Sequence, residues 1–288
     1  MVVAPALPRR FGLEQYSLSF NPRPGQILSY SLNSQMNSTG ESFIGKSLGL
    51  SVQASGEIDL AIRQLSTDNV FTELSTPGLL VTLQSAGGQN ESTLQTPADN
   101  PVQVVFDKSG RIREVRNADI LEKQNILNFP ILDVLQNYLP TYPEKPLEIG
   151  QSWKSHKKMQ IPFQGMNLVI QVEITFTLND VVPSVDGRLG LISASYTVDL
   201  SGQRALEEVV GAFEGKGAGS GTLIFHLDEG HFSEYRLEYS IDGEMIMRRA
   251  DTRLAGWPFS LSVVAGLTLI GKSQPLSSHP RTGRAKGQ

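Results

Sequence analysis

Alternation of apolar and polar residues with a period of two dominates the chain. In SEYRLEYSI (residues 233–241), apolar side chains occupy every second position and charged or polar ones lie between them. A strand points successive side chains to opposite faces, so this pattern predicts a half-buried antiparallel strand. Similar segments lie at 27–32, 57–65, 79–84, 102–106, 168–178, 188–200 and 221–227. We therefore expect one large antiparallel sheet.

Glycine marks the turns and bends of this sheet. DKSG at 107–110 and DEG at 228–230 each place Gly where a hairpin needs positive φ. Gly150 is expected to supply a turn as well. In FEGKGAGSG, glycine occupies alternate positions, which predicts a strand that bends or bulges as the sheet curves, at Gly215, Gly217, Gly219 and Gly221.

One region has helical spacing instead. From 119 to 139 the apolar residues follow an i, i+3, i+4, i+7 stripe, which includes Ile131, Val134, Leu135 and Tyr138. Pro130 suits the first turn of a helix and Pro140 follows its last residue. We expect a short helix, a break and then an amphipathic helix. A second, shorter helical candidate is SGQRALEEVVGAF (201–213).

The two β regions on either side of this helical segment resemble each other. Gly25 and Gly150 each precede a strand, and Gly110 and Gly230 each close a later hairpin, so the offsets are 125 (25 to 150) and 120 (110 to 230). Pseudo-repeats at 22–116 and 147–250, joined by the segment 118–139, are one interpretation, and an unduplicated sheet is the other.

The apolar face of a long twisted sheet has to be buried from water, and the amphipathic helix is the segment that could pack against it. The expected fold is mainly β (α+β), with a large curved antiparallel sheet or half-barrel that wraps a central helix. A single domain at 15–272 would then lie between an N-terminal extension (1–14) and a disordered basic tail (273–288).

The amino-acid composition excludes several classes of function. The 288 residues carry a formal net charge of −4, and only 19% of them are charged, so the basic surface of a nucleic-acid-binding protein is absent. There is no cysteine, which excludes disulfides, thiolate metal sites and cysteine nucleophiles. No segment has the roughly 18 consecutive apolar residues of a transmembrane span. The many Ser, Thr, Asn, Gln and Gly residues favour a periplasmic or extracellular protein whose signal sequence has been removed, with a cytoplasmic location as the alternative.

GESFIGKS at 40–47 matches the phosphate-loop pattern G-x-x-x-x-G-K-[ST]. A working phosphate loop lies between a buried strand and a helix whose N-terminus holds the phosphates. Here both flanking segments have the strand pattern, and no helix follows Ser47. We interpret the segment as a loop between two antiparallel strands and expect no nucleotide cofactor.

The sequence contains no convincing set of catalytic or metal-binding residues. His226 and His231 flank the acids of HLDEGH, but alternation with Leu223, Phe225 and Leu227 predicts that His226 faces solvent and that the acids form a turn. No histidine lies in a recognisable catalytic context. We expect no metal site, no cofactor and no enzymatic activity.

PEKPLEIGQSW (143–153) and the late glycine-rich strand that leads into DEGH resemble segments of a family of uncharacterised bacterial exported proteins and lipoproteins. That family is distantly similar to lipoprotein carriers of the LolA and LolB type, in which a curved sheet encloses helices and an apolar cavity. The motifs themselves are turn and packing motifs. We expect Trp153 to pack at a strand start, with its N–H bonded to a carbonyl.

The resemblance implies an envelope protein that binds or carries a lipid or another apolar ligand. The residues expected to line the site are Ile131, Val134, Leu135, Tyr138, Phe176 and Tyr196. The alternative is a structural or accessory subunit of an envelope assembly, and the most apolar stretch, 257–271, would be its contact surface if it is not a buried strand.

Overall fold

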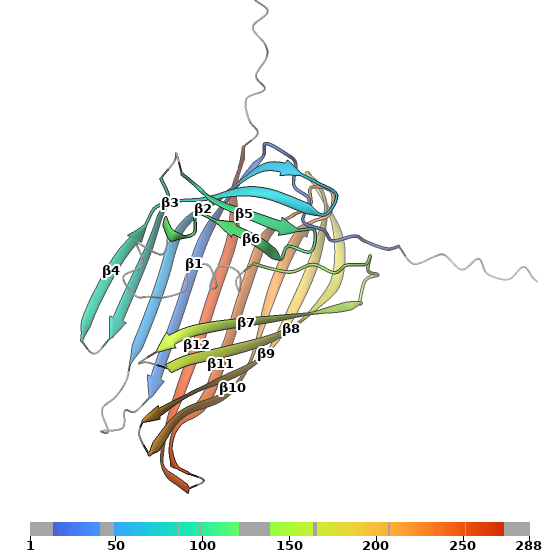
Figure 1. Cartoon of the computed structure of the whole chain (residues 1–288). Coiled ribbons are helices and arrows are strands. Elements are labelled where there is room, and N and C mark those ends of the chain that lie inside the picture. Colours follow the sequence, from blue (N-terminus) through green and yellow to red (C-terminus); the bar gives the residue numbers. More distant parts are fainter. Residues whose placement is uncertain are drawn as a thin grey trace, which may run out of the picture.

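The computed structural model describes residues 14–40, 49–85, 87–97, 100–120, 139–163, 166–206, 208–250 and 252–273. These form one antiparallel sheet of twelve strands (Figure 1). The strands are β1 (Ile27–Gly40), β2 (Leu50–Leu65), β3 (Asn69–Ser85), β4 (Gly88–Leu94), β5 (Val102–Asp107), β6 (Ile112–Arg116), β7 (Ser152–Phe163), β8 (Met166–Ser184), β9 (Gly187–Leu206), β10 (Val209–His226), β11 (His231–Arg249) and β12 (Thr252–Ser273).

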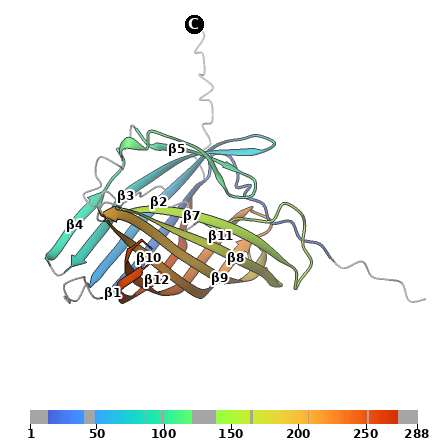
Figure 2. The same cartoon turned by 60° about the horizontal axis from the view of Figure 1, so that its bottom comes forward.

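The spatial order is β6-β5-β3-β2-β1-β12-β11-β10-β9-β8-β7, with β4 paired to β3. The chain therefore runs outward from β1 to one end of this order, crosses to β7 and returns strand by strand to β12. The last strand closes the sheet in the middle by pairing with β1. Both views show a curved sheet whose β7–β9 region turns back over its inner side (Figures 1 and 2).

The inner face is apolar because the strands alternate as their sequences predict. Along β11, every second side chain from Tyr235 to Ile241 is buried and those between are exposed. β12 is a central strand paired on both sides, so the prediction of a strand at 257–271 is confirmed. The turns predicted at 107–110 and 228–230 join β5 to β6 and β10 to β11, with Gly110 and Gly230 at φ 78° and 68°.

The prediction of an α+β fold wrapped around a central helix is wrong. The fold is all-β, and in the described ranges only Asp119 and Ile120 are helical. The inner face is filled instead by the sheet's own side chains and by two extended segments, 16–21 and 139–150. Most of the predicted helix, of the predicted N-terminal extension (1–14) and of the predicted tail (273–288) lies outside the described residues.

The helical prediction for 201–213 is wrong as well. Leu206 ends β9 and Val209 begins β10, and the two residues pair with each other. A tight hairpin places residues i and i+3 opposite each other. A local run of apolar residues at this spacing therefore fits a hairpin as well as a helix.

The two predicted pseudo-repeats share several local features. Gly25 and Gly150 have φ of 81° and 88°, and their N–H groups donate to the carbonyls of Ile62 (2.6 Å) and Leu178 (2.7 Å). One extra residue follows each of these acceptors, so β2 and β8 bulge at matching places. The turn predicted at Gly150 is confirmed, and the duplication stays a prediction.

The alternate glycines of β10 let the sheet coil tightly. A Cβ on Gly219 would lie 2.1 Å from the carbonyl oxygen of Glu238 and 2.4 Å from Cβ of Tyr239. Neither distance leaves room for an atom, so β11 approaches β10 more closely than any other residue would allow. The register between β10 and β11 is unbroken from Val210 to Ile224, so the glycines bend the strand without a bulge at their own positions.

Candidate functional site

Aromatic side chains pack along the inner face of the β7–β11 half of the sheet. Trp153 stacks on Phe176 with ring centroids 5.0 Å apart, and Phe176 lies 6.5 Å from Tyr235. The hydroxyl groups of Tyr196 and Tyr235 are 2.7 Å apart and both are buried. Burial raises the pKa of Tyr196 to about 12, so this hydroxyl pair is neutral at physiological pH.

The prediction that Trp153 packs at a strand start with its N–H bonded to a carbonyl is confirmed. The residue lies at the start of β7, half-buried, and its indole N–H donates to the carbonyl of Thr141 at 2.9 Å. The bond ties the segment before β7 to the sheet, and the ring covers Phe176.

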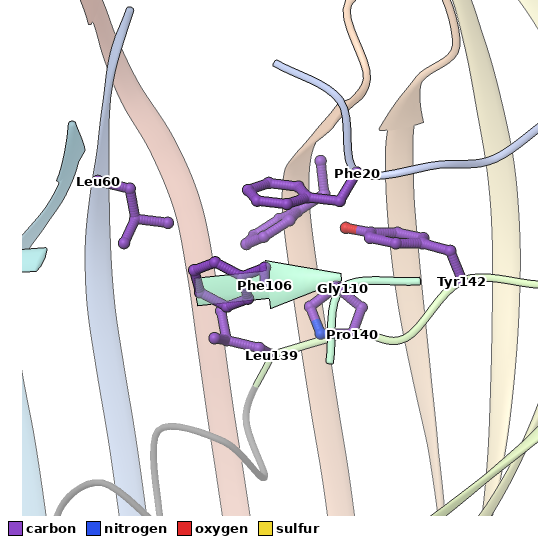
Figure 3. Close-up of a pocket in the computed structure, with 8 residues that line it drawn as sticks. Phe20, Leu60, Phe106, Gly110, Leu139, Pro140 and Tyr142 are labelled. Atoms are coloured by element: carbon purple, nitrogen blue, oxygen red, sulfur yellow. The ribbon is translucent and has the colours of Figure 1, made fainter. Parts of the chain in front are cut away.

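One end of the inner face is closed. We call the end near the turns 108–110 and 227–230 the closed end. Here Phe20 packs edge-on against Phe106 (5.2 Å) and Tyr142 lies 4.7 Å from Phe225. The space between the side chains in Figure 3 is about 10 Å³, which is at the limit of what a single water requires. No ligand can enter here without displacing this core.

The opposite end, where β9 turns into β10 and β11 into β12, is the far end. On several strands, inner-face side chains are fully buried near the closed end and partly exposed toward the far end, whereas Met245 on β11 stays buried there, 4% exposed. On β1, Leu28, Tyr30 and Leu32 are at most 3% exposed, whereas Met36 is partly exposed. The same change occurs on β2, β3, β10 and β12, at Ala54, Val81, Phe213, Trp257 and Phe259.

Phe259 is held by two glycines. Gly215 and Gly243 pair in register on β10 and β11, and their Cα positions leave a notch on the inner face. A Cβ at Gly215 or Gly243 would lie 3.1 or 2.7 Å from Cζ of Phe259. The ring thus reaches across both strands and lies 5.6 Å from the ring of Phe213. Together these side chains form a partly exposed apolar surface.

One basic side chain of β7 points to the inner face. Lys157 alternates along β7 with Trp153, Ser155 and Met159, so it points to the inner face, and its Nζ donates to the carbonyl of Leu139. The side chain is partly exposed by area, yet its amine lies deep among other atoms. Burial lowers the pKa of Lys157 to about 7.

A second polar cluster lies at the closed end. His231 is fully buried, its Nε2 lies 2.8 Å from a carboxylate oxygen of Glu229, and Lys272 donates to the same oxygen at 2.6 Å. Burial lowers the pKa of His231 and of His226. Burial acts to raise the pKa of Glu229, but hydrogen bonds from Lys272 and His231 outweigh it and hold that pKa below its usual value.

The prediction that His226 faces solvent is wrong, because it is only 8% exposed. One extra residue in β11, Ser233, shifts the register beside Phe225, and His226 packs its ring 5.0 Å from that of His231. Within the described ranges, no group of three or more His, Asp and Glu side chains could hold a metal ion.

The predicted lining residues separate into two groups. Phe176 and Tyr196 are buried, 0% and 3% exposed, in the aromatic packing of the inner face. Ile131, Val134, Leu135 and Tyr138 lie outside the described residues. Residues 41–48 of the phosphate-loop match do too, but the predicted strands on either side are confirmed, since β1 and β2 pair antiparallel.

Sequence reasoning missed Phe213, Phe259 and Lys157. Alternation could have assigned all three to the inner face, because each lies two positions from another inner residue. The alternation pattern could not indicate that these residues lie near the far end, because that position depends on the register of six strands relative to one another.

Comparisons with known proteins identify no family. No family model and no curated protein matches the chain. A solved structure from Bacteroides fragilis, described as an exported protein with a YmcC-like fold, is 10% identical over 86% of this chain and 97% of that chain, with a TM-score of 0.23. OccK2 of Pseudomonas aeruginosa, solved with glucuronate, is 7% identical over 85% and 98%, with a TM-score of 0.21. OccK5 of the same organism is 8% identical over 85% and 98%, with a TM-score of 0.20.

These scores are too low to carry a functional argument, and the relation to LolA and LolB carriers stays a prediction. In the part of the chain that the structure describes, no helix is long and apolar enough to cross a membrane.

Proposed function

We propose that this chain is a non-catalytic cell-envelope protein that binds or carries an apolar ligand, such as a lipid or the acyl chain of a lipoprotein, at the far end of its inner face. The observation that carries the proposal is the partly exposed apolar surface there, formed by Met36, Ala54, Val81, Phe213, Trp257 and Phe259.

This surface differs from ordinary surface apolar residues. Single exposed apolar side chains are common, but these are on the concave side of one sheet, and five of the six pack against the buried core, namely Met36, Ala54, Val81, Phe213 and Phe259. Covering them with an acyl chain contributes about 0.8 kcal/mol for each methylene removed from water. The closed end has no such capacity, because its side chains already fill the space.

The non-catalytic role is part of this proposal. His156 pairs with Glu173 and His231 with Glu229, and in the described contacts neither histidine bonds a serine or threonine hydroxyl that could act as a nucleophile. The envelope location rests on composition, which is rich in small polar residues and poor in Lys and Glu.

Native mass spectrometry of protein purified from its own host tests the proposal for a natural ligand, and a mass matching the bare chain alone would count against it.

In vitro, fluorescence of the neutral apolar probe N-phenylnaphthylamine should rise on binding. Phe213→Asp should abolish the rise, since it places a charge on the surface. Val264→Asp is the matched control, because Val264 is 51% exposed on the outer face of β12.

If the probe does not bind the wild-type protein, or if Phe213→Asp and Val264→Asp bind it equally well, the far end is not the site.

A further inference from the structure

A cleft with a volume of about 190 Å³ lies over strands β2, β3, β5 and β6. On β3, Phe71 and Glu73 alternate with buried core residues such as Leu74, so the cleft is on the outer face of the sheet. Its volume is well above the roughly 10–15 Å³ that one water requires and below the roughly 300–1,000 Å³ of pockets for drug-sized ligands. The cleft therefore suits a small ligand. The residues that line it include Arg63, Phe71, Glu73, Gln103, Val105 and Arg116.

Cross-strand pairing places most of these residues in two rows. Val105 on β5 lies opposite Phe71 on β3, and both are half-buried, so they form an apolar floor. In the adjacent row, Gln103 lies between Glu73 and Arg116. Opposite side chains on one face have Cβ atoms roughly 4.5–5.5 Å apart, so a small ligand on the floor reaches the polar row beside it. The cleft is thus apolar at its base and polar along one side.

The charged groups beside this floor carry no net charge. Arg63, from a bulge in β2, pairs with Glu73. Arg116 donates from Nε to Glu114 at 2.7 Å. The charges of the two arginines cancel those of the two glutamates, so the cleft has no net attraction for an anion. A guanidinium has five N–H donors and a carboxylate about four acceptor positions, so one ion pair uses only part of them.

Hydroxyl groups complement this combination of donors and acceptors. Each hydroxyl donates one hydrogen bond and accepts two, so a ring that carries several of them bonds guanidinium, amide and carboxylate groups together. A sugar in its six-membered ring form also presents C–H groups on one face. Small-molecule sites typically combine apolar and aromatic side chains with a few placed polar groups. The chemistry of the cleft therefore matches that of a neutral sugar.

We propose that this cleft binds a neutral monosaccharide unit. The C–H face of the sugar covers Phe71 and Val105. Its hydroxyl groups bond to Glu73, Gln103 and Arg116. The cleft is on the other face of the sheet from the apolar surface at the far end, so the inference goes beyond the proposed function and does not depend on it.

Saturation-transfer difference NMR tests this with the methyl glycosides of glucose, galactose, mannose and N-acetylglucosamine as probes. The methyl glycosides of glucuronate and galacturonate are the charged counterparts. Wild-type protein should give a saturable signal with at least one neutral glycoside, strongest for the C–H protons that lie on the ring of Phe71. The charged glycosides should bind no more tightly than the neutral ones, because the cleft has no net charge to attract them.

Arg116→Gln removes the guanidinium, and a hydrogen bond to a charged group corresponds to about a 10- to 100-fold change in affinity. The affinity for the neutral glycoside should fall by about this factor. Arg236→Gln is the matched control, because Arg236 on the outer face of β11 also pairs through Nε with a glutamate two positions before it, Glu234, at 2.6 Å. Both arginines are exposed, so both variants should keep the circular dichroism spectrum of the wild type.

Three results overturn the inference: no signal with any neutral glycoside, tighter binding of the charged glycosides, or equal affinity of Arg116→Gln and Arg236→Gln for the neutral one. Arg116→Gln should also bind N-phenylnaphthylamine as the wild type does. Failure of the sugar site therefore leaves the proposed function standing, and failure of the apolar probe to bind leaves the sugar site standing.

Discussion

Replacing Gly219 by alanine should destabilise the sheet, because β10 and β11 approach too closely at this position for a side chain. The added Cβ would meet the Glu238 carbonyl oxygen at 2.1 Å and Cβ of Tyr239 at 2.4 Å. Both neighbours belong to the backbone or are attached directly to it, so no rotamer change relieves the clash. β11 has to move by about 1 Å for an ordinary contact of roughly 3.4 Å between carbon atoms.

Overpacking of this kind costs about 1–3 kcal/mol. Alanine also restricts the unfolded chain, which offsets about 0.4–1 kcal/mol of that cost. The expected net loss is about 1–2 kcal/mol in the free energy of unfolding, or a fall of roughly 2–8 °C in Tm for a chain of this size.

Gly78→Ala is the matched control, because Gly78 also lies within a strand and a Cβ there would meet nothing within 4 Å. Urea unfolding followed by circular dichroism should place Gly219→Ala below the wild type and Gly78→Ala within about 0.5 kcal/mol of it. Equal stability of the two variants would refute the claim that the glycines of β10 are required for the coiling of the sheet.

Three further outcomes follow from the same packing. Tyr196→Phe and Tyr235→Phe should each cost about 1–3 kcal/mol, because one buried hydroxyl loses its partner, whereas the double variant should cost less than the sum of the two, as a double-mutant cycle of urea unfolding would reveal. The lowered pKa values of His226 and His231 mean that the unfolded chain takes up protons first, so stability should fall as pH falls below about 6.5 toward the lower pKa values of the folded chain. A Tm series across this range should flatten in His231→Gln, and an unchanged slope would contradict the assignment. Gly110→Ala should lower Tm by more than Gly78→Ala does, because φ is 78° and a Cβ would lie 2.9 Å from the ring of Tyr142.

Local patterns predicted much of this fold. The period of two in the hydrophobic pattern correctly predicted most strands, and Gly110 and Gly230 correctly indicated two hairpin turns. The indole N–H of Trp153 donates to a carbonyl, as expected. These features depend on residues close together in the chain. The helical reading of 201–213 failed because a two-residue hairpin and a helix both bring residues i and i+3 together, and only the pairing of β9 with β10 distinguishes them.

The candidate site was less predictable for a related reason. Phe213, Phe259 and Lys157 come from β10, β12 and β7, which meet only through the register of the strands between them. Alternation predicts which face of the sheet a side chain occupies, but it does not predict the side chain's position along the strand direction relative to neighbouring strands. The same limit explains His226, whose burial depends on one extra residue in the neighbouring strand.

Quenching of tryptophan fluorescence by dibromostearate tests the central claim most directly, because bromine quenches an indole ring only at close range. The chain has two tryptophans: Trp257 shares the far end with Phe259, and Trp153 stacks on Phe176 in the aromatic packing. If the far end binds an acyl chain, saturable quenching should occur in the wild type and disappear in Trp257→Phe. Absence of quenching, or equal quenching in Trp257→Phe, would contradict binding at this surface.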